Sequence, residues 1–280
     1  MTDGTLEAVL RRDRLIVASA LGVIAALAWA YVLWLAADMN MDMAGMSPED
    51  QRATGLRMVP AGMGMMAPAA APWSAVEFAF VFVMWAVMMI GMMAPSAAPM
   101  ILMHARVGRQ GKLAGKPLAA TGWFAAGYFL AWAGFSLAAT LVQWVLEREA
   151  LLNDRMASAN ISLGAIVLIA AGIYQWTPIK NACLAQCQTP FGFLMTHGGF
   201  RSNVLGSVHL GLLHGTYCVG CCWVLMALLF VVGVMNVLWI ALLALLVLLE
   251  KLTPWGRWVA RIAGAVCIAA GAWMIAFRPS

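Results

Sequence analysis

Long apolar stretches separated by short polar connections run along the whole chain. Several of them reach the roughly 20 residues that a helix needs to cross the hydrocarbon core of a bilayer. The pattern therefore predicts an all-α membrane protein, a polytopic bundle of about seven transmembrane helices. The expected helices cover residues 15–37, 76–103, 119–146, 160–177, 204–232, 236–251 and 258–277.

The sixth helix depends on a turn inside one long apolar run. Residues 224–250 are too long for one ordinary span, and the run is expected to turn between Gly233 and Asn236. Without that turn the chain has six spans and its C-terminus changes side. Glu250 and Lys251 close this helix, where we expect a pair at the membrane surface, with helix orientation or proton movement as the alternative role.

Composition supports a single integral membrane domain over residues 1–280, in contact with lipid. Of the 280 residues 64% are hydrophobic and 10% charged, whereas an ordinary soluble domain has roughly 45–50% and 25%. The formal charge of +5 does not indicate nucleic acid binding, because the basic residues lie in short connections. With the N-terminus in the cytoplasm, 12 of the 17 Lys and Arg residues lie on the inner side, as the positive-inside rule requires.

In this orientation residues 38–75 form an extracytoplasmic, Met-rich loop, whose Ala, Gly and Pro content favours a flexible or weakly folded segment. Core packing does not explain methionine there. A thioether binds monovalent copper far better than zinc, magnesium or calcium, so the loop is expected to capture that ion. The alternative is a low-complexity segment on the membrane surface. The methionines are Met39, Met41, Met43, Met46, Met58, Met63, Met65 and Met66.

Methionines also form a ladder in the second predicted helix. At 100° per residue Met84, Met88 and Met92 fall on one stripe, with Met89 and Met93 beside it. A path of metal ligands and a purely structural stripe are equally supported, because methionine fills irregular gaps in packed helices.

Prolines and glycines predict two further features of the helices. Pro95 and Pro99 should loosen or end the second helix and free carbonyls that a neighbouring helix or a cavity must satisfy. Gly211 and Gly215 form a GxxxG pair in the fifth helix, which allows another helix to approach closely.

The strongest local signal is HLGLLHGTYCVGCC, residues 209–222. His214, Cys218, Cys221 and Cys222 project to one side of a helix near the middle of the membrane, where polar groups usually face a partner or a cavity. Imidazole and thiolate are ligands of soft metal ions, so a metal site is favoured over redox thiols or packing.

Cys183 and Cys187, in KNACLAQCQTP, form a second cysteine pair after the fourth predicted helix. Their CxxxC spacing allows chelation on one helical turn, and it differs from the CxxC of thiol oxidoreductases. Metal transfer and simple packing are equally open for this pair. Cys267 is isolated in the last helix and is expected to pack.

Four stretches of the chain resemble a family of uncharacterised bacterial integral membrane proteins classed as metal-binding. They are MWAVMMIGMMAPSAAPMIL (84–102), YQWTPIKNACLAQCQTPFGFL (174–194), LGLLHGTYCVGCCWVLMALLFVVGVMNVLW (210–239) and LLEKLTP (248–254). The resemblance implies the helical fold, a metal site and the inner (cytoplasmic) membrane of a bacterium. The Met-rich loop is not part of it.

These observations predict a protein that binds a soft metal and acts in metal uptake, transfer or homeostasis. Copper is favoured because of the methionines, and zinc and iron are the alternatives. The partners are the metal ion and a metallochaperone or assembly partner. A metal- or thiol-dependent membrane oxidoreductase is an alternative, of which the thiol version is the weaker because the vicinal Cys221 and Cys222 would form a strained disulfide. No P-loop is present, so transport driven by the chain's own ATP hydrolysis is not supported. A structural or assembly subunit without metal is a third hypothesis.

Overall fold

The computed structural model describes residues 3–44, 56–58, 66–68, 73–110, 117–149, 151, 161–199, 201 and 203–277. Nearly all of them are helical, which confirms the predicted all-α fold. The helices are α1 (Asp3–Ala44), α3 (Ala75–Gln110), α4 (Pro117–Arg148), α5 (Ile161–Tyr174), α6 (Pro178–Gln188), α7 (Pro190–Thr196), α8 (Val204–Ala227), α9 (Leu229–Val232), α10 (Val237–Leu252) and α11 (Gly256–Ala276).

Within the described ranges, five segments are long and apolar enough to cross a membrane. They are Leu15–Asp38, Ala75–Val107, Ala120–Arg148, Val204–Val232 and Gly256–Ala276. α5 and α6 form a sixth candidate, bent by 63° at the break between them. α10 occupies the predicted sixth range, but its 16 residues are fewer than the roughly 20 of a full span.

The predicted turn before α10 is present. Gly233 has a φ of 102°, which lies in the left-handed region that glycine adopts without steric cost. The side chain of Asn236 then caps α10 by accepting a hydrogen bond from the Trp239 amide at 3.4 Å. The turn and the cap together separate α10 from α8 and α9.

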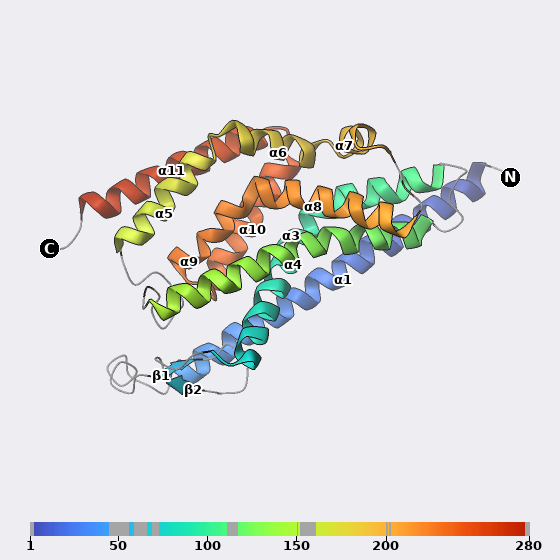
Figure 1. Cartoon of the computed structure of the whole chain (residues 1–280). Coiled ribbons are helices and arrows are strands. Elements are labelled where there is room, and N and C mark those ends of the chain that lie inside the picture. Colours follow the sequence, from blue (N-terminus) through green and yellow to red (C-terminus); the bar gives the residue numbers. More distant parts are fainter. Residues whose placement is uncertain are drawn as a thin grey trace.

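The helices pack in pairs (Figure 1). α4 lies along α8, α1 lies along α3, and α5 pairs with α11 on the side of the chain's C-terminus. Glycine sets the α4–α8 distance, because a Cβ at Gly211 would overlap the carbonyl oxygen of Phe124 and one at Gly215 would lie 2.6 Å from the Cβ of Ala131. The close helix contact expected from the GxxxG pair is therefore made with α4.

α3 continues through Pro95 and Pro99 to Gln110, so the expectation that these prolines end the helix is wrong. The expected consequence for the backbone does occur. Pro95 has no N–H to donate to the Gly91 carbonyl, and the indole Nε1 of Trp29 on α1 donates to that oxygen at 3.2 Å. The neighbouring helix thus replaces the missing hydrogen bond.

The predicted loop of residues 38–75 has more structure than expected. α1 extends to Ala44, and strands β1 (Leu56–Met58) and β2 (Met66–Pro68) form an antiparallel ribbon in which Met58 is opposite Met66. Met46, Met63 and Met65 lie outside the described residues. The loop's role in metal capture stays a prediction.

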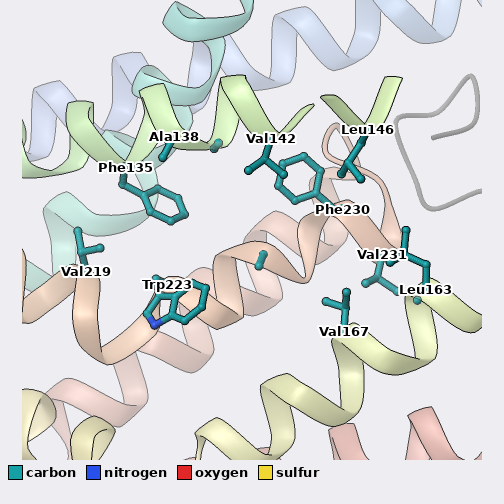
Figure 2. Close-up of a pocket in the computed structure, with 13 residues that line it drawn as sticks. Phe135, Ala138, Val142, Leu146, Leu163, Val167, Val219, Trp223, Phe230 and Val231 are labelled. Atoms are coloured by element: carbon teal, nitrogen blue, oxygen red, sulfur yellow. The ribbon is translucent and has the colours of Figure 1, made fainter. Parts of the chain in front are cut away.

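An apolar cavity of about 500 Å³ opens between α4 and α5, next to α8 and α9. Figure 2 shows Phe135 and Val142 of α4 facing Trp223 and Phe230, with Val167 of α5 on the far side. Its lining carries hydrocarbon and aromatic groups in place of metal ligands. A metal site must therefore lie elsewhere in the bundle.

Candidate metal centre

α8 places the four predicted ligands in the interior. Cys218, Cys221 and Cys222 are at most 2% exposed and His214 is 3% exposed. The neighbouring His209 is exposed, as expected from its position on the opposite side of the helix. One face of α8 therefore carries three thiols and an imidazole into the protein core.

The second cysteine pair reaches this face from α6. α6 begins at Pro178 after the N-cap Thr177 and packs against α8. The Cys187 thiol lies close enough to those of Cys218 and Cys221 to interact with both. Cys183 lies one turn earlier, and a Cβ added at Gly220 would lie 3.0 Å from its sulfur. The chain bends by 63° between α5 and α6, and α6, which carries both thiols, then packs against α8.

Lys251, at the end of α10, is the cation that contacts these thiols. Its Nζ donates to the Cys218 Sγ at 2.8 Å and to the Ser96 Oγ at 3.3 Å, and it lies 3.8 Å from the Met93 Sδ. The side chain is only 5% exposed, so the prediction that it lies at the membrane surface is wrong. It joins sulfur atoms of α3 and α8 around one ammonium group.

Glu250, the other half of the predicted surface pair, is also buried, at 1% exposed. Its Oε2 accepts from the Lys180 Nζ at 2.6 Å, and its Oε1 accepts from the Gln175 Nε2 at 3.2 Å. The Gln188 Nε2 donates to the Glu250 backbone carbonyl at 2.7 Å. These contacts attach the end of α10 to α6, which sequence spacing does not reveal.

Tyr128 of α4 connects the thiols with His214. Its hydroxyl lies 2.9 Å from the Cys218 Sγ, and its ring centroid lies 5.9 Å from that of His214. Phe193 of α7 also packs edge-on against His214, at 4.9 Å. Among the described residues the His214 Nδ1 has no hydrogen-bond partner, so this buried nitrogen has a free position for a ligand.

The methionine ladder is buried in the same core as the cysteines. Met84, Met88 and Met92 are at most 2% exposed. Met93, beside the predicted stripe, contacts the Lys251 ammonium, which in turn contacts the Cys218 thiol. Thioethers thus reach the site from α3, one position away from the expected residue.

A series of hydrogen-bonded polar side chains runs from Trp85, next to Met84 of the ladder, to the end of α4. The Trp85 Nε1 donates to the Gln143 Oε1 at 2.8 Å, and the Gln143 Nε2 donates to the Glu147 Oε1 at 2.8 Å. Trp73, just before α3, donates to the other oxygen of Glu147 at 3.1 Å. Since Trp85 follows Met84, this polar chain connects the ladder with the last residues of the Met-rich loop.

In the part of the chain that the structure describes, no group of three or more His, Cys, Asp or Glu side chains already has the arrangement of a metal site. The thiols of Cys221 and Cys222 each donate to the Cys218 carbonyl oxygen, at 3.1 Å. Each of these thiols must lose the proton of that hydrogen bond before it binds an ion as a thiolate. The donor set suits a soft, low-coordinate ion.

The sequence model of the PpoB2 family, described as copper chaperone, matches residues 82–274, more than half of the chain. The chain belongs to this family. No curated protein and no solved structure matches it. The matched range contains the PpoB2-family segments that bring Cys187, Cys218 and Lys251 together, and it leaves out α1 and the Met-rich loop.

Three residues at this centre were not expected from the sequence in these roles. Lys251 was assigned to the surface, Tyr128 lies in no motif, and Met93 was placed beside the stripe. A charged residue that ends an apolar run next to a cysteine-rich helix was the available signal for Lys251. Nothing in the sequence singles out Tyr128.

Proposed function

We propose that this protein is a membrane-embedded copper chaperone that binds Cu(I) among the thiols of α6 and α8 and passes it to an acceptor protein. The observation that carries the proposal is the contact of Cys187 with Cys218 and Cys221 from two different helices. Membership of the PpoB2 copper chaperone family supports copper as the cargo.

The central site in this proposal consists of Cys187, Cys218, Cys221 and Cys222, with His214 as a nitrogen donor. Thiolate and imidazole bind monovalent copper strongly in a dry environment. The His214 Nδ1 without a hydrogen-bond partner among the described residues and the buried thiols of Cys221 and Cys222 support this assignment. A site with more donors than one Cu(I) needs allows the ion to move by ligand exchange.

The outer methionines supply the ion in this scheme, and Met84, Met88 and Met92 carry it along α3. Exchange from thioether to thiolate makes each step inward more strongly bound. Cys183, one turn from Cys187, offers an accessory position from which an acceptor takes the ion. We place the protein in the inner membrane of a bacterium, with the N-terminus in the cytoplasm and residues 38–75 outside, on the distribution of Lys and Arg.

Metal analysis of protein purified anaerobically in detergent, without chelators, tests the site. Wild type is expected to hold copper in a constant ratio to protein and to retain it against a Cu(I)-specific chelator. Cys218→Ser removes a sulfur ligand and His214→Ala a nitrogen ligand. Each should weaken retention at least as much as the roughly 10–100-fold caused by loss of an outer-shell partner.

Cys267→Ser is the matched control, since it makes the same chemical change on α11, away from the thiols of α6 and α8. It should leave copper retention unchanged. Equal retention in all three variants and in wild type would show that these residues pack and bind no copper. Copper in wild type together with a reversible disulfide between the α6 and α8 thiols would favour the oxidoreductase alternative.

A further inference from the structure

Lys251 places a fixed positive charge inside the proposed ligand set. Its Nζ is 2.8 Å from the Cys218 Sγ and 3.8 Å from the Met93 Sδ, so an ion bound to Cys218 lies beside the ammonium. The side chain is 5% exposed. Water therefore screens this charge weakly.

No neighbouring carboxylate pairs with Lys251 among the described residues. Lys180 and Glu250 neutralise each other at 2.6 Å, and Gln175 and Gln188 occupy two more acceptor positions of Glu250. Among the described residues Lys251 forms no salt bridge with a carboxylate. The other titratable groups around it are the thiols, the Tyr128 hydroxyl and His214. The close partners of the ammonium are therefore sulfur atoms, and an ion held by those sulfurs lies next to it.

This arrangement has a consequence for which ion the centre accepts. Repulsion between the ammonium and a bound ion is proportional to the charge of the ion. A divalent ion is therefore repelled twice as strongly as a monovalent ion in the same position. Soft donors alone do not make this distinction, because thiolates bind Zn²⁺ and Cd²⁺ as well as Cu(I).

We infer that Lys251 is a specificity-determining residue that excludes divalent metal ions from the thiol centre and so reserves it for a monovalent one. The inference rests on the proposed metal site, and it assigns to Lys251 a role that a metal ligand cannot have. It also gives a functional reason for burying an ammonium among sulfur atoms, since desolvation of the charge costs free energy that its partners must offset. Repulsive elements of this kind are a common basis of specificity.

The test compares two soft ions that differ in charge and are stable to air oxidation, Ag(I) and Cd(II). Their affinities for the purified full-length protein are measured by competition with a chelator of known affinity. Wild type is expected to prefer Ag(I). Lys251→Leu should shift the ratio of the two affinities toward Cd(II) by on the order of a thousandfold, because one unit charge acts at about 4 Å in a medium with an effective dielectric constant of about 20.

Two matched variants separate charge from other effects. Lys251→Arg keeps the charge and should keep the wild-type ratio. Arg257→Met removes one positive charge at an exposed position of α11 and should also keep it. If Lys251→Leu does not fold, as judged by its elution from a sizing column, Lys251→Gln takes its place and should shift the ratio in the same direction.

Three results would overturn the inference alone. They are equal Ag(I) and Cd(II) affinities in wild type, an unchanged ratio in Lys251→Leu or Lys251→Gln, or the same shift in Lys251→Arg. If wild type binds neither ion, the proposed function fails together with the inference. If it binds both equally, the metal site stands and the role of Lys251 does not.

Discussion

The ion pair of Lys180 and Glu250 is a residue-scale feature on which the position of Lys251 depends. Both side chains are almost fully buried, and a buried carboxylate that loses its partner cannot regain water. Lys180→Met should therefore lower the free energy of unfolding by about 3–5 kcal/mol. Denaturant titration of the protein in detergent, followed by Trp fluorescence, measures this change.

The double variant Lys180→Met with Glu250→Leu is the control for that prediction. It removes both charges and leaves no unpaired carboxylate, so it should be much more stable than the single variant. Equal losses in the single and double variants would mean that the pair contributes through packing alone.

At the same scale, the sequence predicted which α8 residues are buried and failed for the charged ones. Helical periodicity alone places His214 and Cys218 on one face, because both belong to one regular helix. Lys251 depends on contacts with α3 and α8, which are distant in sequence. A charge at the end of an apolar run is usually at the membrane surface, and only the surrounding helices make this one an exception.

Among the helices, the contact of α4 with α8 positions the thiol face, and it depends on glycine. Gly211→Ala adds a Cβ where the Phe124 carbonyl oxygen lies, so the two helices must separate. Overpacking of this kind should cost about 1–3 kcal/mol and should weaken copper retention, since Cys218 moves with α8. Thermal unfolding and the chelator competition measure the two effects.

Gly134→Ala is the matched control for that prediction. Gly134 is a helical glycine of α4 with no atom within 4 Å of an added Cβ. The substitution should be neutral or stabilise the helix by about 0.5–1 kcal/mol. If Gly211→Ala behaves in the same way, the two helices are not held at their distance by this glycine.

The existence of the helices was predictable, but their breaks were only partly so. The turn at Gly233 was expected because glycine and asparagine interrupt an apolar run. The 63° bend between α5 and α6 was not, because the fourth helix was expected to run unbroken over residues 160–177. The ribbon of β1 and β2 was also missed, since residues rich in Ala, Gly and Met give no alternating pattern.

For the molecule as a whole, the orientation in the membrane decides whether the Met-rich loop can collect copper from outside. Alkaline phosphatase fused after Gly62 should be active, because the enzyme folds only outside the cytoplasm. The same fusion after Gly115, in the basic connection between α3 and α4, should be inactive.

Green fluorescent protein at the same two positions is the complementary control and should fluoresce only after Gly115. The opposite pattern would place the loop in the cytoplasm. The proposal that it captures copper from outside would then be withdrawn, while the thiol centre would be unaffected.

The short helix α6 links two parts of the molecule through adjacent residues. Cys187 contacts the thiols of α8, and Gln188 holds the backbone at the end of α10. A tilt of α6 would therefore move the Cys187 sulfur away from the thiols of α8. The same movement would weaken the hydrogen bond from Gln188 that holds the end of α10, where Lys251 lies. An acceptor that docks on α6 would then release the ion from the thiols of α6 and α8 without entering the protein core.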